Sequence, residues 1–135
     1  MRRVLLRWGP ALGWAAVVFA VSAQERLLQL PGVLAWDKLQ HSTGFVLGGL
    51  LLARALEGSR GATLLAFALG LAYAATDELH QLFVPGRNAD PRDWLADAVG
   101  IAAGIAAWRL YIFLVERRAR RRAPAREGVA AVNHA

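Results

Sequence analysis

A chain of 135 residues has room for one domain, and its hydrophobic fraction of 56% is higher than that of ordinary soluble domains. The absence of cysteine excludes disulfides, thiolate metal sites and a cysteine nucleophile. The net charge of +6 depends on six arginines between Arg117 and Arg126, close behind an apolar segment. A basic run in that place is typical of a membrane flank and argues against nucleic-acid binding.

Four long apolar segments predict four membrane-spanning helices. In chain order they are approximately residues 8–23, 37–56, 62–82 and 91–115. The first also resembles a signal peptide, because basic residues precede it and Val21-Ser22-Ala23 is similar to a cleavage site. The length of this first apolar segment and the membrane spans that follow it favour a segment that remains in the mature protein. We therefore predict an all-α bundle of four transmembrane helices over residues 1–116, followed by a basic, disordered tail at 117–135.

The connection between the last two helices contains two local signals. Val84-Pro85-Gly86-Arg87 suits a type II turn, in which Gly86 takes the positive φ that other residues avoid. Asp90 followed by Pro91 predicts an N-cap and a proline at the first helical position. Together they predict a tight turn that leads directly into the fourth helix.

Basic residues are divided unequally between the two sides of the predicted bundle. If the N-terminus is cytoplasmic, the cytoplasmic segments carry Arg2, Arg3, Arg7, Arg54, Arg60 and the six arginines of the tail. The opposite side carries only Arg26, Lys38, Arg87 and Arg92. The positive-inside rule therefore predicts a multi-pass protein of the cell membrane with both termini cytoplasmic.

Polar residues interrupt three of the apolar helices at their predicted extracytoplasmic ends. Each set repeats at helical spacing and therefore shares one helix face. The sets are Asp37 and His41; Tyr73, Asp77, His80 and Gln81; and Asp93, Asp97, Gly100 and Gly104. Charged side chains that face lipid cost roughly 2.5–3.5 kcal/mol each near the bilayer centre, so the three faces should meet inside the bundle. We predict a polar pocket near the outer leaflet, with the glycines packed closely beneath it.

The predicted pocket contains groups suited to acid/base chemistry. Histidine beside a carboxylate is a common general acid/base pair, because the carboxylate fixes the imidazole tautomer. The candidate catalytic residues are therefore His41, His80, Asp37, Asp77 and Asp97. Asp97 is the hardest to explain as a structural residue, because it lies a full turn inside the fourth helix. Asp37 and His41 have a structural alternative, in which they form a pair at the start of the second helix.

Cations at the same end are suited to phosphate oxygens. The candidate substrate-binding residues are Lys38, Gln81, Arg87, Asp93 and Tyr73. Each cation has a simpler alternative: Lys38 extends to the membrane interface, and Arg87 only holds the turn in place. Glu78 points away from Asp77 on the helix and is expected to be exposed. Imidazole and carboxylate also suit a metal, but no HExxH or comparable ligand spacing is present, so neither a metal nor a cofactor is predicted.

Three motifs together resemble the VanZ-like membrane protein family. They are Asp37-Lys38-x-x-His41, then Asp77-Glu78-x-x-Gln81 with Pro85-Gly86-Arg87, then Asp93-x-x-x-Asp97-x-x-Gly100-x-x-x-Gly104, all within residues 36–104. The resemblance implies a small multi-helix membrane protein whose motif residues form an active site. It also implies that lipid headgroups or lipid-linked cell-wall intermediates are processed there, and the family's namesake is linked to glycopeptide resistance.

Two functions follow as hypotheses. The first is an enzyme that transfers or hydrolyses at a phosphodiester of a lipid headgroup or lipid-linked intermediate in the outer leaflet. The second is a non-catalytic membrane protein that binds a lipid or an antibiotic. A proton or ion path fits poorly, because the inner halves of the helices are nearly pure Ala, Leu, Val and Gly. The predicted partners are therefore membrane lipids, with no nucleic acid.

Overall fold

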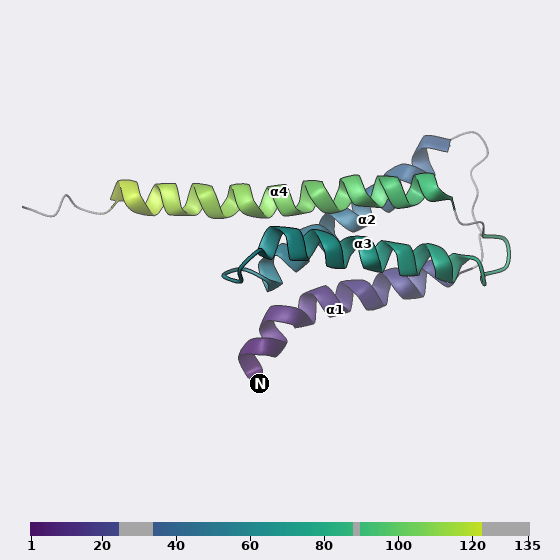
Figure 1. The fold of residues 1–135 in the computed structure, drawn as a ribbon, viewed down its shortest axis with the longest axis horizontal. Coiled ribbons are helices and arrows are strands. Elements are labelled where there is room, and N and C mark those ends of the chain that lie inside the picture. Colours follow the sequence, from purple (N-terminus) through teal and green to yellow (C-terminus); the bar gives the residue numbers. More distant parts are fainter. Residues whose placement is uncertain (25–33, 88–89, 123–135) are drawn as a thin grey trace, which may run out of the picture.

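The computed structural model describes residues 1–24, 34–87 and 90–122, with all of their side chains except those of residues 34–41. These residues form four helices and no strand: α1 (Arg2–Ser22), α2 (Leu34–Ala55), α3 (Ala62–Gln81) and α4 (Pro91–Arg122) (Figure 1). The all-helical prediction is confirmed for this part of the chain. Helices α1, α3 and α4 are each long and apolar enough to cross a membrane, and α2 is apolar from Ser42 to Ala55.

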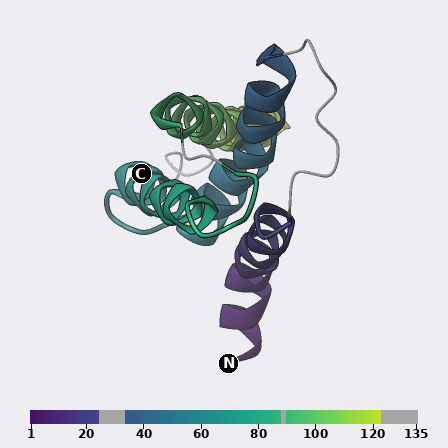
Figure 2. The same ribbon diagram turned by 90° about the vertical axis from the view of Figure 1, so that its right-hand side faces the viewer.

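The helices lie roughly along one direction, so their connections gather at two ends (Figure 1). One end holds the last turns of α1 and α3 and the first turns of α2 and α4. The other end holds the N-terminus and the α2–α3 connection, and α4 runs on beyond it (Figure 1). The view turned by 90° shows α1 on the side of the bundle away from α4 (Figure 2). Helix α2 contacts each of the other three.

Helices α2 and α4 pack backbone against backbone. A Cβ atom on Gly100 would overlap the carbonyl oxygen of Ser42, and one on Gly104 would overlap that of Val46. Because the contacting residue numbers rise together, the two helices run parallel. Only glycine permits so close an approach. The small-residue face predicted for the fourth helix is therefore confirmed, and its partner is α2.

Aromatic side chains attach α1 to the helices beside it. The Trp14 indole lies over Gly48 and donates a hydrogen bond of 2.9 Å to the carbonyl oxygen of Gly44 in α2. The Tyr73 hydroxyl of α3 donates to the carbonyl oxygen of Ala15 at 2.5 Å. Both polar tips are thereby satisfied inside an apolar interface, which allows these large rings to be buried there.

The connection into α4 has the predicted local structure. Gly86 has a φ of 77°, and the N–H of Arg87 donates to the carbonyl oxygen of Val84 at 3.1 Å. The carboxylate of Asp90 accepts the N–H of Arg92 at 2.9 Å, as an N-cap should, and α4 begins at Pro91. The turn and the cap are both confirmed.

The outer limits of α1 and α4 differ from the prediction. Helix α1 already begins at Arg2, and α4 continues past Val115 to Arg122. The first residues of the predicted disordered tail are therefore helical, while residues 123–135 lie outside the described part of the chain. The reason is that arginine and alanine favour helix, and no glycine or proline separates Ile105 from Arg122.

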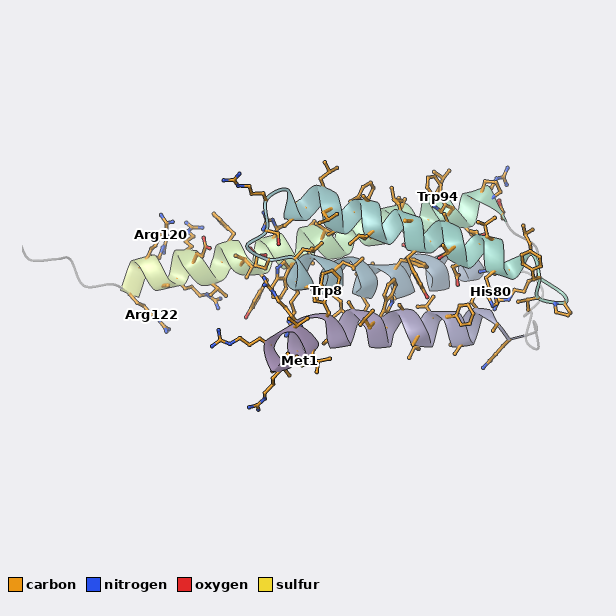
Figure 3. All side chains as sticks on the ribbon, turned by 60° about the horizontal axis from the view of Figure 1, so that its bottom comes forward. Met1, Trp8, His80, Trp94, Arg120 and Arg122 are labelled. Atoms are coloured by element: carbon orange, nitrogen blue, oxygen red, sulfur yellow. The ribbon has the colours of Figure 1, made fainter. Side chains whose placement is uncertain are left out.

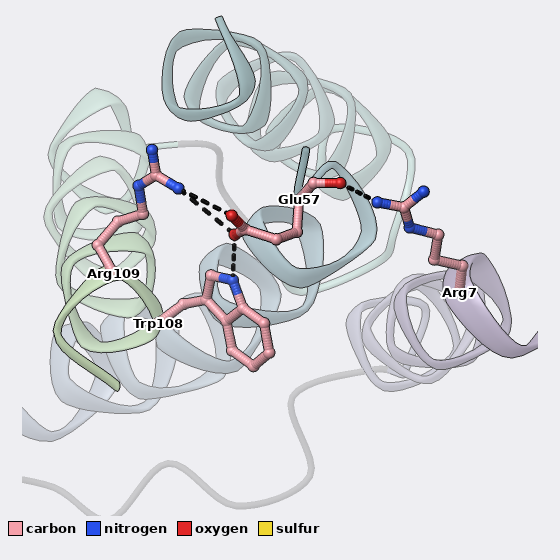
Figure 4. Close-up of polar contacts among 4 residues, drawn as sticks. All are labelled: Arg7, Glu57, Trp108 and Arg109. Carbon is pink, nitrogen blue, oxygen red and sulfur yellow. Dashed lines mark hydrogen bonds and ion pairs between the residues drawn. The ribbon is translucent and has the colours of Figure 1, made fainter. Parts of the chain in front are cut away.

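Glu57, in the α2–α3 connection, joins helices at the end where α1 begins (Figure 4). Its carboxylate accepts the Trp108 indole N–H at 2.7 Å and lies 3.3 Å from the Arg109 guanidinium, both on α4. Arg7 of α1 donates to the backbone carbonyl oxygen of Glu57. The sequence pattern predicted no role for Glu57. These contacts place the α2–α3 connection level with Trp108.

Candidate functional site

Buried polar side chains gather at the end where α1 and α3 finish and α2 and α4 start. We call them the polar cluster, and in the described part of the chain they are Ser22, Asp77, Glu78, Gln81, Asp93 and Asp97. Figure 3 shows His80 and Trp94 at this end, and Met1, Arg120 and Arg122 at the other. A soluble protein rarely buries this many carboxylates without a purpose. Polar residues predicted on the third and fourth helices are therefore buried at the same end of the bundle.

Asp97 occupies the deepest position of the polar cluster on α4. It is 0% exposed, and Gly100 and Gly104 follow it at helical spacing on the face that packs against α2. Asp93, one turn before it on the same face, is 7% exposed. The two carboxylates of α4 therefore lie on the side of the helix that faces α2.

Asp77 belongs to a short chain of hydrogen bonds between α3 and α1. The Gln81 amide donates to Oδ2 of Asp77 at 3.1 Å and to Oγ of Ser22 at 3.2 Å. All three side chains are buried. The second carboxylate oxygen of Asp77, Oδ1, is buried without a hydrogen-bond partner in the described part of the chain. Gln81 thus holds Asp77 in one orientation and leaves Oδ1 able to accept a further hydrogen bond.

Glu78 is buried, which corrects the expectation that it is exposed. Only 8% of it is accessible, and its Oε2 accepts the backbone N–H of Asp90 at 3.1 Å. The backbone of Asp90, just before α4, therefore lies against this carboxylate. Helical spacing alone could not predict that contact, because Asp90 belongs to a connection and not to a neighbouring helix.

His80 faces α1. Its imidazole stacks on the ring of Phe19, with the centroids 4.4 Å apart and the planes inclined by 28°. Its Nε2 is buried and has no hydrogen-bond partner among the described residues. The structure therefore brings His80 to the same end as the polar cluster, and no carboxylate is bound to its Nε2 among those residues.

Like Gln81, the predicted substrate-binding residues Tyr73 and Arg87 contact α1 or the residues just after it. The Tyr73 hydroxyl donates a hydrogen bond to the carbonyl oxygen of Ala15. Tyr73 lies one helical turn before Asp77 on α3, further from the end of the bundle. The Arg87 Nε lies 3.5 Å from the carbonyl oxygen of Gln24, at the end of α1. This long contact agrees with the alternative that Arg87 holds the turn in place.

The residues predicted on α2 are Asp37, Lys38 and His41, and their side chains lie outside the described part of the structure. The helix itself covers all three positions. Because Gly100 meets the Ser42 backbone, the turn of α2 that precedes Ser42 runs beside the start of α4. The backbone register thus agrees with a contribution of α2 to the site.

No group of three or more His, Asp or Glu side chains is arranged to hold a metal ion within the described residues. Sequence reasoning also missed one member of the polar cluster. Ser22 was considered only as part of a cleavage-like sequence, yet it is 5% exposed and bonded to Gln81. The sequence feature that could have indicated its burial is its position, because Ser22 is the polar residue that ends the apolar run 8–21 of α1.

The comparison with known families agrees with the geometry. The VanZ/LLP1 family matches residues 8–114, a region that contains all four helix cores and the complete polar cluster. No curated protein and no solved structure matches significantly. With a match over most of its length, the chain belongs to the VanZ/LLP1 family.

Proposed function

We propose that the chain crosses the membrane four times, with both termini cytoplasmic and the polar cluster at the extracytoplasmic side. The 22 residues of α2 correspond to about 33 Å of helix, enough for a hydrocarbon core of about 30 Å. The arginine-rich ends of α1 and α4 lie at the opposite end from the polar cluster (Figure 3). The positive-inside rule assigns that basic end to the cytoplasm.

At that site the protein binds a phosphate-bearing headgroup of a lipid or of a lipid-linked cell-envelope intermediate. The observation that carries this proposal is the burial of four carboxylates at one end of a membrane bundle. Buried anions require cations or donors nearby. The basic residues that the chain offers at this end include Lys38, His41 and Arg87. A site with both signs of charge at headgroup depth suits a ligand that carries phosphate and hydroxyl groups.

The reaction that fits these groups is transfer or hydrolysis at a phosphodiester. One imidazole, of His41 or His80, takes the proton of the attacking hydroxyl or water as its oxygen bonds to phosphorus. The bond to the leaving oxygen breaks, and the other imidazole gives that oxygen a proton. Lys38 and Arg87 hold the non-bridging oxygens, and Asp97 orients an imidazole.

A non-catalytic lipid- or antibiotic-binding protein is the second candidate. It is favoured by the position of His80, which stacks on Phe19 and has no carboxylate bound to its Nε2 in the described part of the chain. In that case the polar cluster would hold a headgroup without changing it.

Purified full chain in lipid nanodiscs separates the two candidates. The substrates are phosphatidylglycerol and a polyprenyl-diphosphate-linked sugar, and released headgroups are counted by mass spectrometry. We expect turnover by the wild type and a loss of about 100-fold or more in Asp97→Asn, in line with the removal of an acid/base network. Glu57→Gln removes a carboxylate at the opposite end and should keep full turnover. Saturable binding without product would support the second candidate, and neither binding nor product would refute both.

A further inference from the structure

The end of α4 extends beyond the rest of the bundle. Trp108 and Arg109 are level with the α2–α3 connection, because both bind Glu57. From residue 110 to Arg122 the helix continues for about 20 Å. Leu110, at 57% exposed, is typical of the large apolar side chains that follow Arg109. An isolated helix of this length is marginal in water, so its surroundings must stabilise it.

The apolar run of α4 begins inside the bundle, at residue 98, and continues past the α2–α3 connection into this extension, to residue 115. Residues 98–115 are uncharged except for Arg109, whose guanidinium is paired with Glu57 at 3.3 Å. They correspond to about 27 Å of helix, close to the thickness of a hydrocarbon core of about 30 Å.

Arginines follow this apolar run closely on α4. Five of them lie between Arg117 and Arg122, and all are exposed. The rise from Arg117 to Arg122 is about 7.5 Å, comparable to the headgroup layer on one side of a bilayer of about 40–45 Å in total. Arg2 and Arg3, also exposed, lie at the same end as shown by the position of Met1 (Figure 3). Guanidinium groups pair bidentately with phosphate oxygens.

We propose that residues 117–122 of α4, with Arg2 and Arg3, form a docking surface for anionic phospholipid headgroups in the leaflet opposite the polar cluster. The surface recognises the negative phosphodiester of lipids that lack a compensating ammonium group. A membrane is favoured over nucleic acid because exposed apolar side chains, such as Leu110 and Phe113, closely precede the arginines on α4. The proposal depends on neither the catalytic nor the binding activity proposed for the polar cluster.

The test uses the full chain in vesicles of phosphatidylcholine with a small amount of spin-labelled lipid. Electron paramagnetic resonance measures the share of labelled lipid that is immobilised by the protein. We expect spin-labelled phosphatidylglycerol to be enriched about fivefold over spin-labelled phosphatidylcholine, the effect of roughly one arginine at a membrane surface. The enrichment should fall as salt is raised, because the pairs are exposed.

A matched pair of variants decides the assignment. Changing all five arginines of residues 117–122 to glutamine should remove most of the enrichment and leave only what Arg2 and Arg3 supply, while Arg92→Gln, an exposed arginine at the other end, should keep it. Tryptophan fluorescence verifies that both variants remain folded. Unchanged enrichment of phosphatidylglycerol in the variant with five substituted arginines would overturn the proposal. So would tighter retention of a labelled single-stranded RNA than of phosphatidylglycerol, since that result would assign the surface to nucleic acid.

Discussion

Gly104→Ala tests the close contact between α2 and α4. A Cβ atom at this position would overlap the Val46 carbonyl oxygen and lie 2.7 Å from the Leu50 backbone nitrogen, where ordinary contact begins at 3.4 Å. Both obstacles are backbone atoms, which cannot rotate away, so α2 must shift by about 1 Å or more. Overpacking costs about 1–3 kcal/mol, and alanine recovers up to about 1 kcal/mol of helix propensity. Because the clash is with backbone, we expect a net loss of about 2 kcal/mol.

Gly44→Ala is the matched control. It makes the same chemical change inside α2, but a Cβ atom there meets nothing within 4 Å. It should leave the free energy of unfolding unchanged or raise it by up to about 1 kcal/mol. Both variants are compared by SDS-induced unfolding in mixed micelles, followed by tryptophan fluorescence. If Gly104→Ala were as stable as the wild type, or if both variants shifted alike, the inferred backbone contact would be wrong.

Two further substitutions test the polar end of the bundle. Gln81→Leu leaves the Ser22 hydroxyl and an oxygen of Asp77 without their shared donor, and should cost about 1–3 kcal/mol of unfolding free energy in the same assay. Adding Ser22→Ala to it should cost less than the sum of the single changes, whereas strict additivity would contradict the coupling. Asp90→Ala removes the cap on the Arg92 N–H and should cost about 1 kcal/mol, while Asp90→Asn should cost much less; equal losses would argue against a capping role.

Much of the architecture was predictable because it follows from local rules. The third helix was predicted almost to its ends, since a polar, glycine-bounded link precedes it and a Pro-Gly turn follows it. The cap at Asp90 and the positive φ of Gly86 depend only on neighbouring residues. The burial of Asp97 also followed from the sequence, because lipid excludes a charge placed a full turn inside an apolar helix.

Contacts that depend on tertiary structure could not be predicted in the same way. Glu78 accepts a hydrogen bond from the backbone of Asp90, in the connection before α4, and the Tyr73 hydroxyl donates to the Ala15 carbonyl oxygen of a different helix. Ser22 is buried because Gln81 reaches it across the α1–α3 interface. Helical spacing assigns residues to faces, but it does not say which neighbouring element covers each face.

The same packing that positions the polar cluster also limits how it exchanges protons and ligands. Below Asp97, the α2–α4 contact consists of glycines against backbone, and the surrounding core is built from apolar side chains such as Trp14, Phe45 and Ile101. Protons would need a continuous polar path, and these described side chains provide none along that contact. This apolar packing supports the proposed headgroup site at one membrane face more than a conduction path through the bundle. An enlarged residue at Gly104 should accordingly disturb headgroup binding through the position of α4, even though it lies two turns below Asp97.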